Sequence, residues 1–417
     1  MTTWPAPDAV DVLLQRPDET EPSAVGSLRR VGAGSRTAIS FTFDQAWLDD
    51  RRSFAIDPSL GLYPGEQFAP GGGLPGIFMD AAPDRWGRSL MERREAAEAA
   101  ADGRRIRRLD DWDFLLGVAD SVRMGGLRLR DPRTAAYLDD RPQPVPPIAR
   151  LRELEAAARG LESARQDPHS EARWLDVLLA PGSSLGGARP KATFLDESGA
   201  PWIAKFPSRS DTIDVGAWEY VLHGLATKAG IEVPETRLLD LRSGHRTFAA
   251  RRFDRDGSVR RHYASAMTLT GHVDGEPASY LDVAEAISDH ADASAIPSEL
   301  EQAYRRLVFN VLAGVRDDHL RNHGFLWGIR GWHLSPAFDL TPTPTRDRHA
   351  LSLDGDSDEP DLAAVIRVAP YFRLSRLEAN AVVNEVRGAV AGWRSNARAV
   401  GLGAFDMQQM EPAFVED

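Results

Sequence analysis

The sequence predicts an α+β fold with two lobes, because strand-like segments in the middle of the chain are followed by mainly helical ones. Two short apolar runs, residues 191–195 and 202–206, follow a glycine-rich loop at 182–188 and read as a strand pair. In residues 297–314 the apolar side chains recur at helical spacing. With 417 residues, two or three domains are expected. We therefore expect a strand-rich N-lobe and an all-helical C-lobe.

The composition excludes several classes of function. The chain has no cysteine, which excludes disulfides, thiolate metal sites and a cysteine nucleophile. Its formal net charge of −12 argues against a broad surface for nucleic-acid phosphates. No apolar run approaches the ~20 residues that a membrane span needs. The first residues lack the basic start and apolar centre of a signal peptide, so a cytoplasmic protein without membrane contact is expected.

The first part of the chain reads as a small α/β subdomain. Residues 37–43 alternate as a half-buried strand, the glycines at 71–73 predict a turn, and residues 90–101 predict a helix. Five prolines in residues 131–150 predict an extended boundary segment. The predicted organisation is an N-terminal subdomain, a proline-rich linker, the N-lobe and the C-lobe, at residues 1–135, 136–150, 151–255 and 256–417.

The elements after the linker follow from capping and stop signals. Residues 211–229 predict a helix that Asp211 caps and Gly230 ends. Ser375 and Glu378 form a capping box for a long helix that ends near Gly401. The remaining predicted elements are a helix at 148–161, strands at 236–240 and 247–250, and the helix at 297–314.

The run of residues 317–322, Asp-Asp-His-Leu-Arg-Asn, has the spacing of a phosphoryl-transfer site. In protein kinases the catalytic Asp precedes a metal-binding Asn by five positions, and a second metal-binding Asp follows later. Asp317 and Asn322 have this separation, whereas Asp318 is one position too close. Strand-like residues 323–327 and 331–334 predict a hairpin that would return Asp339 to the same site.

A lysine and a glycine-rich loop complete the kinase pattern. Lys205 ends a strand-like run, and Glu219 lies on the next predicted helix, as in the lysine–glutamate pair of kinases. The loop has the G-x4-G half of a phosphate-binding motif, but Ala188 replaces its lysine, so it is not a Walker A loop. Its backbone could still approach phosphates, with Arg189 and Lys191 supplying positive charge.

Other functions fit parts of this pattern. His319 and His323 are four positions apart, but Leu320 replaces the glutamate that a zinc protease motif requires. A two-metal nuclease would leave Lys205 and the glycine-rich loop unexplained. A small-molecule phosphotransferase would use the same acids. In a DNA-bound co-repressor, kinase activity would be secondary to repression. These two alternatives stay open beside a protein kinase.

Five segments of this sequence, taken together, resemble the HipA family of bacterial serine/threonine kinases, which are the toxins of toxin–antitoxin pairs. The segments are SSLGGARPKA at 183–192, WIAKFP at 202–207, RRFDR at 251–255, FNVLAGVRDDHLRNHGFL at 309–326 and LSPAFDLTPTP at 334–344. PDRWGR at 83–88 and DFLLGVADSVRMGGLRL at 113–129 are similar to the family's N-terminal subdomain. The resemblance implies a HipA-like bilobal, protein-kinase-like fold.

The resemblance also implies roles for individual residues. Asp317 would be the catalytic base, and Asn322 and Asp339 would hold Mg²⁺. The ATP contacts would be Ser184, Gly186, Gly187, Ala188, Lys205, Arg251, Phe253 and His319. Ser184, or Ser183 beside it, would be the loop serine that family members autophosphorylate, and phosphate there would repel ATP. Some relatives carry an acidic residue where this chain has Arg251.

The partners implied by the resemblance are macromolecular. A small helix-turn-helix antitoxin, similar to HipB, would bind the kinase and supply contact with operator DNA. The DNA contact would therefore be indirect, which agrees with the acidic net charge of this chain. Better-studied relatives phosphorylate aminoacyl-tRNA synthetases, so a synthetase is one expected class of protein substrate.

Overall fold

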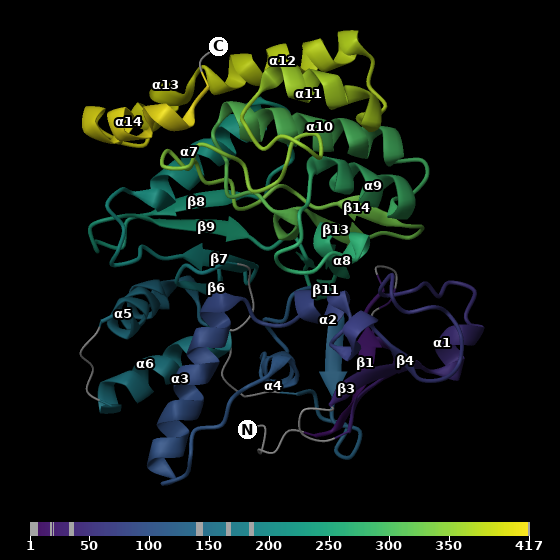
Figure 1. Ribbon diagram of the computed structural model, residues 1–417. Helices are drawn as coiled ribbons and strands as arrows, with labels where there is room; N and C mark the ends of the chain where they lie inside the picture. Colours follow the sequence, from purple (N-terminus) through teal and green to yellow (C-terminus); the bar gives the residue numbers. More distant parts are fainter. Residues whose placement is uncertain are drawn as a thin grey trace. The chain divides into compact units, whose positions relative to one another are not determined.

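The computed structural model describes residues 7–16, 19, 21–32, 37–138, 145–163, 168–182 and 187–415, of which 168–169 and 180–182 are described by backbone alone. Within this part the chain forms two compact units, each with its own strands and helices (Figure 1). The first unit comprises Met1–Arg209 and Asp254–Ala264, and the second comprises Ser210–Phe253 and Ser265–Asp417. The predicted division into subdomain, linker and two lobes stays a prediction.

The first unit contains a five-stranded antiparallel sheet with strand order β4-β3-β2-β1-β5. The predicted strand at 37–43 is confirmed as β3. Apolar side chains alternate along β1 and β3, and Val10, Val12 and Phe41 are fully buried. The strands are β1 Ala9–Leu14, β2 Ser23–Val31, β3 Ala38–Phe43, β4 Gln67–Phe68 and β5 Leu127–Arg130.

The first unit also contains a second, smaller strand pair, which helices of the same unit contact. The predicted strands at 191–195 and 202–206 are confirmed as the antiparallel pair β6 Lys191–Leu195 and β7 Pro201–Lys205. The Trp86 indole donates a hydrogen bond to the Lys191 carbonyl, which ties a helix N-terminus to β6. The helices are α1 Gln45–Asp49, α2 Gly76–Asp80, α3 Arg85–Ala101, α4 Asp111–Leu116, α5 Leu151–Leu161 and α6 Pro168–Gly182, with short 3-10 turns at Pro70–Gly72 and Ile148–Arg150.

The segment 254–264 returns to the first unit and contains the short pair β10 Arg255–Asp256 and β11 Val259–Arg260 and most of β12 Tyr263–Ser265. The Asp254 carboxylate accepts a hydrogen bond from the Gly125 backbone at 2.8 Å, and Arg255 donates to the Arg123 carbonyl at 2.6 Å. The motif RRFDR is therefore divided, with 251–253 in the second unit and 254–255 in the first.

The second unit begins with a helix packed on an antiparallel strand pair. Helix α7 Val215–Lys228 contacts both β8 Thr236–Leu239 and β9 Thr247–Arg251. The predicted cap of this helix is wrong: Asp214, not Asp211, accepts the hydrogen bond from the Ala217 amide. The helix starts four residues later than expected because residues 211–213 form a bend before it.

Helices make up most of the remainder of the second unit, but the C-lobe predicted to be all-helical also contains the strands Gly324–Trp327 and Trp332–Leu334. The central helix α10 Ile296–Leu312 packs against α9 and α12, and its face of apolar residues is fully buried. The others are α8 Ala266–Thr270, α9 Tyr280–His290, α11 Leu362–Val368, α12 Arg376–Val390, α13 Trp393–Ala399 and α14 Ala404–Met410, with 3-10 turns at Leu320–Asn322, Ala369–Phe372 and Glu411–Ala413. The capping box of Ser375 and Glu378 is confirmed, but α12 ends at Val390 rather than near Gly401, and α13 follows after a break.

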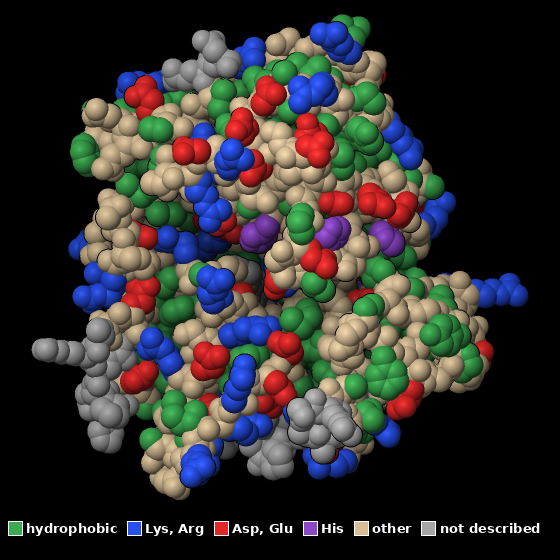
Figure 2. All heavy atoms as spheres, in the orientation of Figure 1, with side chains coloured by type: hydrophobic (Ala, Val, Ile, Leu, Met, Phe, Trp, Pro, Cys, Tyr) green, Lys and Arg blue, Asp and Glu red, His purple; other side chains and the backbone are tan. Residues whose placement is uncertain are grey.

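A membrane span is not present among the described helices, since none of them is both long enough and apolar enough. On the face shown in Figure 2, Lys and Arg side chains alternate with Asp and Glu side chains rather than forming one large basic area.

Candidate active site

The 317–322 run follows directly after α10 in the second unit. Gly314 has φ of +66°, which ends the helix and turns the chain. The buried Arg316 guanidinium then donates hydrogen bonds to four backbone carbonyls, those of Thr343, Arg346, Pro412 and Ala413. The start of the run is thus fixed by two segments that come later in the chain.

The two adjacent acids of this run face opposite environments. The Asp318 side chain is buried, and its Oδ2 atom accepts hydrogen bonds from the Tyr280 hydroxyl (2.7 Å), Asn310 Nδ2 (2.8 Å) and His323 Nε2 (2.8 Å). The Asp317 side chain is 64% exposed, and its Oδ1 atom lies 2.6 Å from Nη1 of Arg346. Only Asp317 of the pair can therefore meet a substrate from solvent.

The partners of Asp318 keep it ionised. Burial alone raises the pKa of this carboxyl, but His323 and the hydrogen bonds from Tyr280 outweigh burial and lower the pKa below its ordinary value. Burial and the nearby Asp318 charge raise the pKa of Tyr280 well above its ordinary value, so the phenol stays a proton donor. The acid is a structural anchor of the run.

Asn322 and His319 lie on the short turn that completes the run. Asn322 is nearly buried, and its Nδ2 donates to the Asp317 carbonyl at 3.4 Å. His319 precedes the turn Leu320–Asn322 and is exposed. Arg321 pairs with Asp274 at 2.8 Å. The turn therefore brings the Asn322 side chain to the backbone of Asp317.

The hairpin predicted between Asn322 and Asp339 is confirmed. Strands β13 Gly324–Trp327 and β14 Trp332–Leu334 pair antiparallel, and the Ser335 amide donates to the Gly324 carbonyl at 2.8 Å. The buried Arg306 of α10 donates to the Ser335 carbonyl at 2.6 Å, and burial lowers the pKa of this guanidinium to about 10. The chain is thus anchored where it leaves the hairpin on the way to Asp339.

Asp339 itself has a left-handed backbone, with φ of +60°. A non-glycine residue in this region is uncommon and is found more often at functional sites. The preceding ring, Phe338, packs against Phe253 with the ring centroids 5.5 Å apart. Phe253, which is predicted to contact adenine, therefore packs against the residue that precedes Asp339, a predicted metal ligand.

Asn322 and Asp339, the two residues predicted to bind metal, are of residue types that fit magnesium. Asn322 and Asp339 offer an amide oxygen and a carboxylate, which are the hard ligands that Mg²⁺ prefers. In the part of the chain that the structure describes, no three His, Cys, Asp or Glu residues cluster as a complete metal site. Magnesium usually takes one or two protein carboxylates together with substrate phosphates and water, so a two-residue donor set is sufficient.

The predicted nucleotide residues outside this run have different surroundings. Lys205 is half-buried at the end of β7 in the first unit, and Glu219 is buried on α7 in the second. Their predicted pairing stays a prediction. Arg251 is exposed at the end of β9, where its guanidinium lies 3.8 Å from the Glu235 carboxylate.

The glycine-rich loop is described only at its end. Gly187, with φ of +105°, and Ala188 are exposed, whereas Ser183, Ser184 and Gly186 lie outside the described residues. Lys191 places its ammonium next to the loop residue Gly187, and its charge is also paired with an acid. Its buried Nζ lies 2.7 Å from Oδ2 of Asp84, the residue that caps α3, and burial raises the pKa of that carboxyl.

The sequence did not indicate the partners of the 317–322 run. Arg346, Arg316, Tyr280 and Asn310 each contact the run or its neighbour, and they come from segments up to 38 residues away. Arg346 follows the alternating Thr-Pro segment 341–345, which carries no signal for an ion pair. A polar Asn310 on the buried face of α10 was the one detectable sign, since a buried amide needs a partner.

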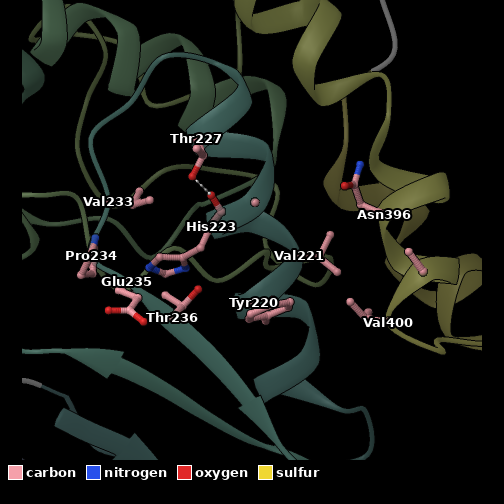
Figure 3. Close-up of a pocket in the computed structure, with 12 residues that line it drawn as sticks. Tyr220, Val221, His223, Thr227, Val233, Pro234, Glu235, Thr236, Asn396 and Val400 are labelled. Atoms are coloured by element: carbon pink, nitrogen blue, oxygen red, sulfur yellow. Dashed lines mark hydrogen bonds between the residues drawn. The ribbon is translucent and has the colours of Figure 1, made fainter. Parts of the chain in front are cut away.

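A separate cavity of about 550 Å³ lies within the second unit. Its walls come from α7, from the segment 233–236 and from the end of α13, as Figure 3 shows with Tyr220 and His223 on one side and Asn396 and Val400 on another. None of the predicted catalytic or metal-binding residues lines it. It is therefore distinct from the candidate active site.

Comparison with known proteins gives matches over most of the chain. The family model of the HipA-like C-terminal domain matches residues 183–393, and that of the HipA N-terminal domain matches residues 20–126. The putative kinase Y4dM of Sinorhizobium fredii (strain NBRC 101917 / NGR234) is 29% identical over 174 residues, which are 35% of this chain and 38% of that protein. The matched region thus spans well under half of that curated relative.

Solved structures extend the comparison to the fold. A chain in the complex of HipA, HipB and operator DNA of the Shewanella oneidensis MR-1 toxin–antitoxin system aligns with a TM-score of 0.65 and 14% identity, over 97% of this chain and 96% of that one. The Helicobacter pylori proinflammatory kinase CtkA aligns at 0.33 and 15% identity, over 53% and 94%. The first similarity confirms the predicted HipA-like α+β fold.

Proposed function

Because this chain belongs to the HipA family, we propose that it is an ATP- and magnesium-dependent serine/threonine-protein kinase that acts as the toxin of a bacterial toxin–antitoxin pair. The observation that carries the proposal is the arrangement of the 317–322 run: Asp317 faces solvent while Asp318 is held in the core. A catalytic base needs this exposure to reach a substrate hydroxyl.

The proposed reaction uses each residue of the run in one role. Asp317 accepts the proton of the attacking serine or threonine hydroxyl. Asn322 and Asp339 would hold Mg²⁺, which would supply positive charge to the nucleotide phosphates. The hydrogen bond from the Asn322 amide to the Asp317 carbonyl and the left-handed backbone of Asp339 support these roles.

The nucleotide contacts are proposed for two groups of residues. Lys205 contacts the ATP phosphates, and the segment 251–253 lines the adenine site. The packing of Phe253 on Phe338 supports the second assignment, because it places the adenine segment next to Asp339. Arg251 contributes its backbone rather than its side chain, which is directed to Glu235. Autophosphorylation of Ser184 or Ser183 in the glycine-rich loop would switch the kinase off.

We propose a small helix-turn-helix antitoxin as the partner. The support is the aligned chain from a complex that also contains HipB and operator DNA. This chain has a formal net charge of −12 and a mixed surface, so the antitoxin would supply most of the positive charge for DNA. The proposed site of action is the cytoplasm.

Phosphate mapping tests the kinase activity. The purified chain is incubated with Mg-ATP and a cell lysate, and phosphorylated serines and threonines are identified by mass spectrometry. We expect phosphate on Ser183 or Ser184 and on at least one lysate protein, and neither with the Asp317→Ala variant. If the wild-type chain transfers no more phosphate than this variant does, the kinase assignment is wrong.

A further inference from the structure

Arg346 lies beside the proposed catalytic base and has no role in the function described above. Its Nη1 atom is 2.6 Å from Oδ1 of Asp317, and both side chains are about half exposed or more, at 49% and 64%. We propose that Arg346 is a catalytic residue whose guanidinium binds the phosphoryl group during its transfer. This inference rests on the proposed kinase function and adds a residue to its active site.

The Arg346–Asp317 pair contributes little to the stability of the fold. Exposed ion pairs are typically worth about 0–1 kcal/mol, because water screens the charges and two side chains lose freedom. The backbone that presents Arg346, however, is held firmly: the buried Arg316 donates to the Arg346 carbonyl at 2.5 Å and to the Thr343 carbonyl at 3.3 Å. The fold thus anchors the backbone from which Arg346 reaches Asp317, although the ion pair itself adds little stability.

Other arginines near this run are engaged elsewhere. Arg321, inside the run, pairs with Asp274 at 2.8 Å. Arg348, two positions after Arg346, pairs with Asp358 at 2.7 Å and with Glu359 at 3.0 Å. Arg316 is buried against backbone carbonyls. Of these four arginines, Arg346 is the one directed to the carboxylate that would receive the substrate proton.

The chemistry of transfer explains why a guanidinium belongs there. The substrate hydroxyl oxygen forms a bond to the γ-phosphorus, the bond from that phosphorus to the bridging oxygen breaks, ADP leaves, and the hydroxyl proton passes to Asp317. Negative charge on the transferred group is spread over three equatorial oxygens, which a fork of N–H donors can bind. Protonation neutralises Asp317, and this weakens its hold on Arg346 at the step when the phosphoryl group needs a cation.

Binding of a transition-state analogue tests the role without a protein substrate. Isothermal titration measures the affinity of the full chain for Mg-ADP alone and for Mg-ADP with fluoroaluminate, which imitates the transferred phosphoryl group. We expect fluoroaluminate to tighten binding to the wild type. In Arg346→Ala the gain in affinity from fluoroaluminate should be about 100-fold smaller. Removal of one preorganised donor to a transition state typically lowers the rate by about 10²–10³-fold. Affinity for Mg-ADP alone should be unchanged.

Arg348→Ala is the matched control, because it removes an exposed arginine of the same segment whose partners lie away from Asp317. It should keep the full gain from fluoroaluminate. Phosphate transfer should fall about 100-fold in kcat with Arg346→Ala, with KM for ATP little changed, and Arg346→Lys should restore part of it. Thermal unfolding of all three variants should match the wild type, since both arginines are exposed.

Three results would overturn the inference. Wild-type affinity of Arg346→Ala for the analogue would exclude contact with the phosphoryl group. Faster phosphate transfer by Arg346→Ala would show that the pair restrains Asp317. Either result, obtained while Asp317→Ala is inactive, would leave the kinase assignment standing. A wild-type chain that binds neither Mg-ADP nor the analogue and transfers no phosphate would overturn both proposals.

Discussion

The Asp318 carboxylate and the His323 ring, 2.8 Å apart, join the two ends of the turn that carries Asn322. The contact lies in the core, because both side chains are at most 5% exposed. Tyr280 at the start of α9 and Asn310 on α10 complete the set of donors to the same carboxylate oxygen. These buried hydrogen bonds to Asp318 thus hold the segment that carries the exposed residues Asp317 and His319.

Replacement of Asp318 should therefore affect mainly the stability of the fold, and replacement of Asp317 mainly phosphate transfer. Asp318→Ala leaves three buried donors without their acceptor and should lower the free energy of unfolding by about 3–5 kcal/mol. Asp317→Ala should change it by less than about 1 kcal/mol, because its ion pair is exposed, while abolishing phosphate transfer. Urea denaturation followed by tryptophan fluorescence measures the first effect, and the kinase assay measures the second. Equal losses of stability would contradict this division of roles.

A second pair of variants separates two lysines that lie opposite each other on β6 and β7, Lys191 and Lys205. Lys191→Met removes the cation beside the buried Asp84 and should cost up to about 3–5 kcal/mol of stability. The raised pKa of Asp84 allows protonation, which reduces this loss. Lys205→Met should weaken ATP binding at least ~10-fold, as titration with a fluorescent ATP analogue would show. Similar ATP affinities of Lys205→Met and the wild type would contradict the assignment of Lys205.

Two buried histidines make stability depend on pH. Burial lowers the pKa of His262 to about 3 and that of His349 to about 4, against 6.5 for an ordinary histidine. Between these values the unfolded chain binds protons that the folded chain does not, so the unfolding free energy falls as the pH is lowered from about 6.5 toward 4. The expected slope is up to about 1.4 kcal/mol per pH unit for each histidine.

Urea denaturation at pH 7.0, 6.0 and 5.0 measures this slope. His262→Asn removes one of the two groups, so it should reduce the slope. Retention of the full wild-type slope by this variant would show that other groups cause it.

Two glycines should respond to alanine with opposite signs. Gly314 has φ of +66°, and a Cβ there would overlap the carbonyl oxygen of Ala413. Gly314→Ala should therefore destabilise the chain by at least about 1–3 kcal/mol. Gly388 lies exposed within α12 with nothing near its Cβ position, so Gly388→Ala should stabilise by about 0.5–1 kcal/mol. Thermal unfolding distinguishes the two, and a gain in stability for Gly314→Ala would contradict the observed turn.

Features set by short stretches of sequence could be predicted. The spacing of Asp317 and Asn322, the hairpin before Asp339 and the capping box at Ser375 each depend on a few neighbouring residues. The cap of α7 was missed because Asp211 and Asp214 are both suitable, and only the bend at 211–213 decides between them.

Contacts between distant segments could not be predicted. Asp84 and Lys191 are 107 residues apart, and Asp317 and Arg346 are 29 apart. The pairing of Lys191 with a buried acid depends on how α3 packs on β6, which no local pattern encodes. The spacing to Asn322 favoured Asp317 over Asp318 as the catalytic base. The structure adds the physical reason: Asp318 is buried and accepts hydrogen bonds from three donors, one of which, Tyr280, comes from a segment that is distant in sequence.

The hydrogen bonds of Arg316 to Pro412 and Ala413 also have a consequence for biosynthesis. These carbonyls belong to residues made 96 and 97 positions after the arginine. At roughly 5–20 residues per second, a ribosome needs on the order of 5–20 seconds to add them. During that interval the nascent chain already contains Asp317 but lacks part of its support. The hydrogen bonds that hold the chain just before Asp317 can therefore form only after residues 412 and 413 have been made.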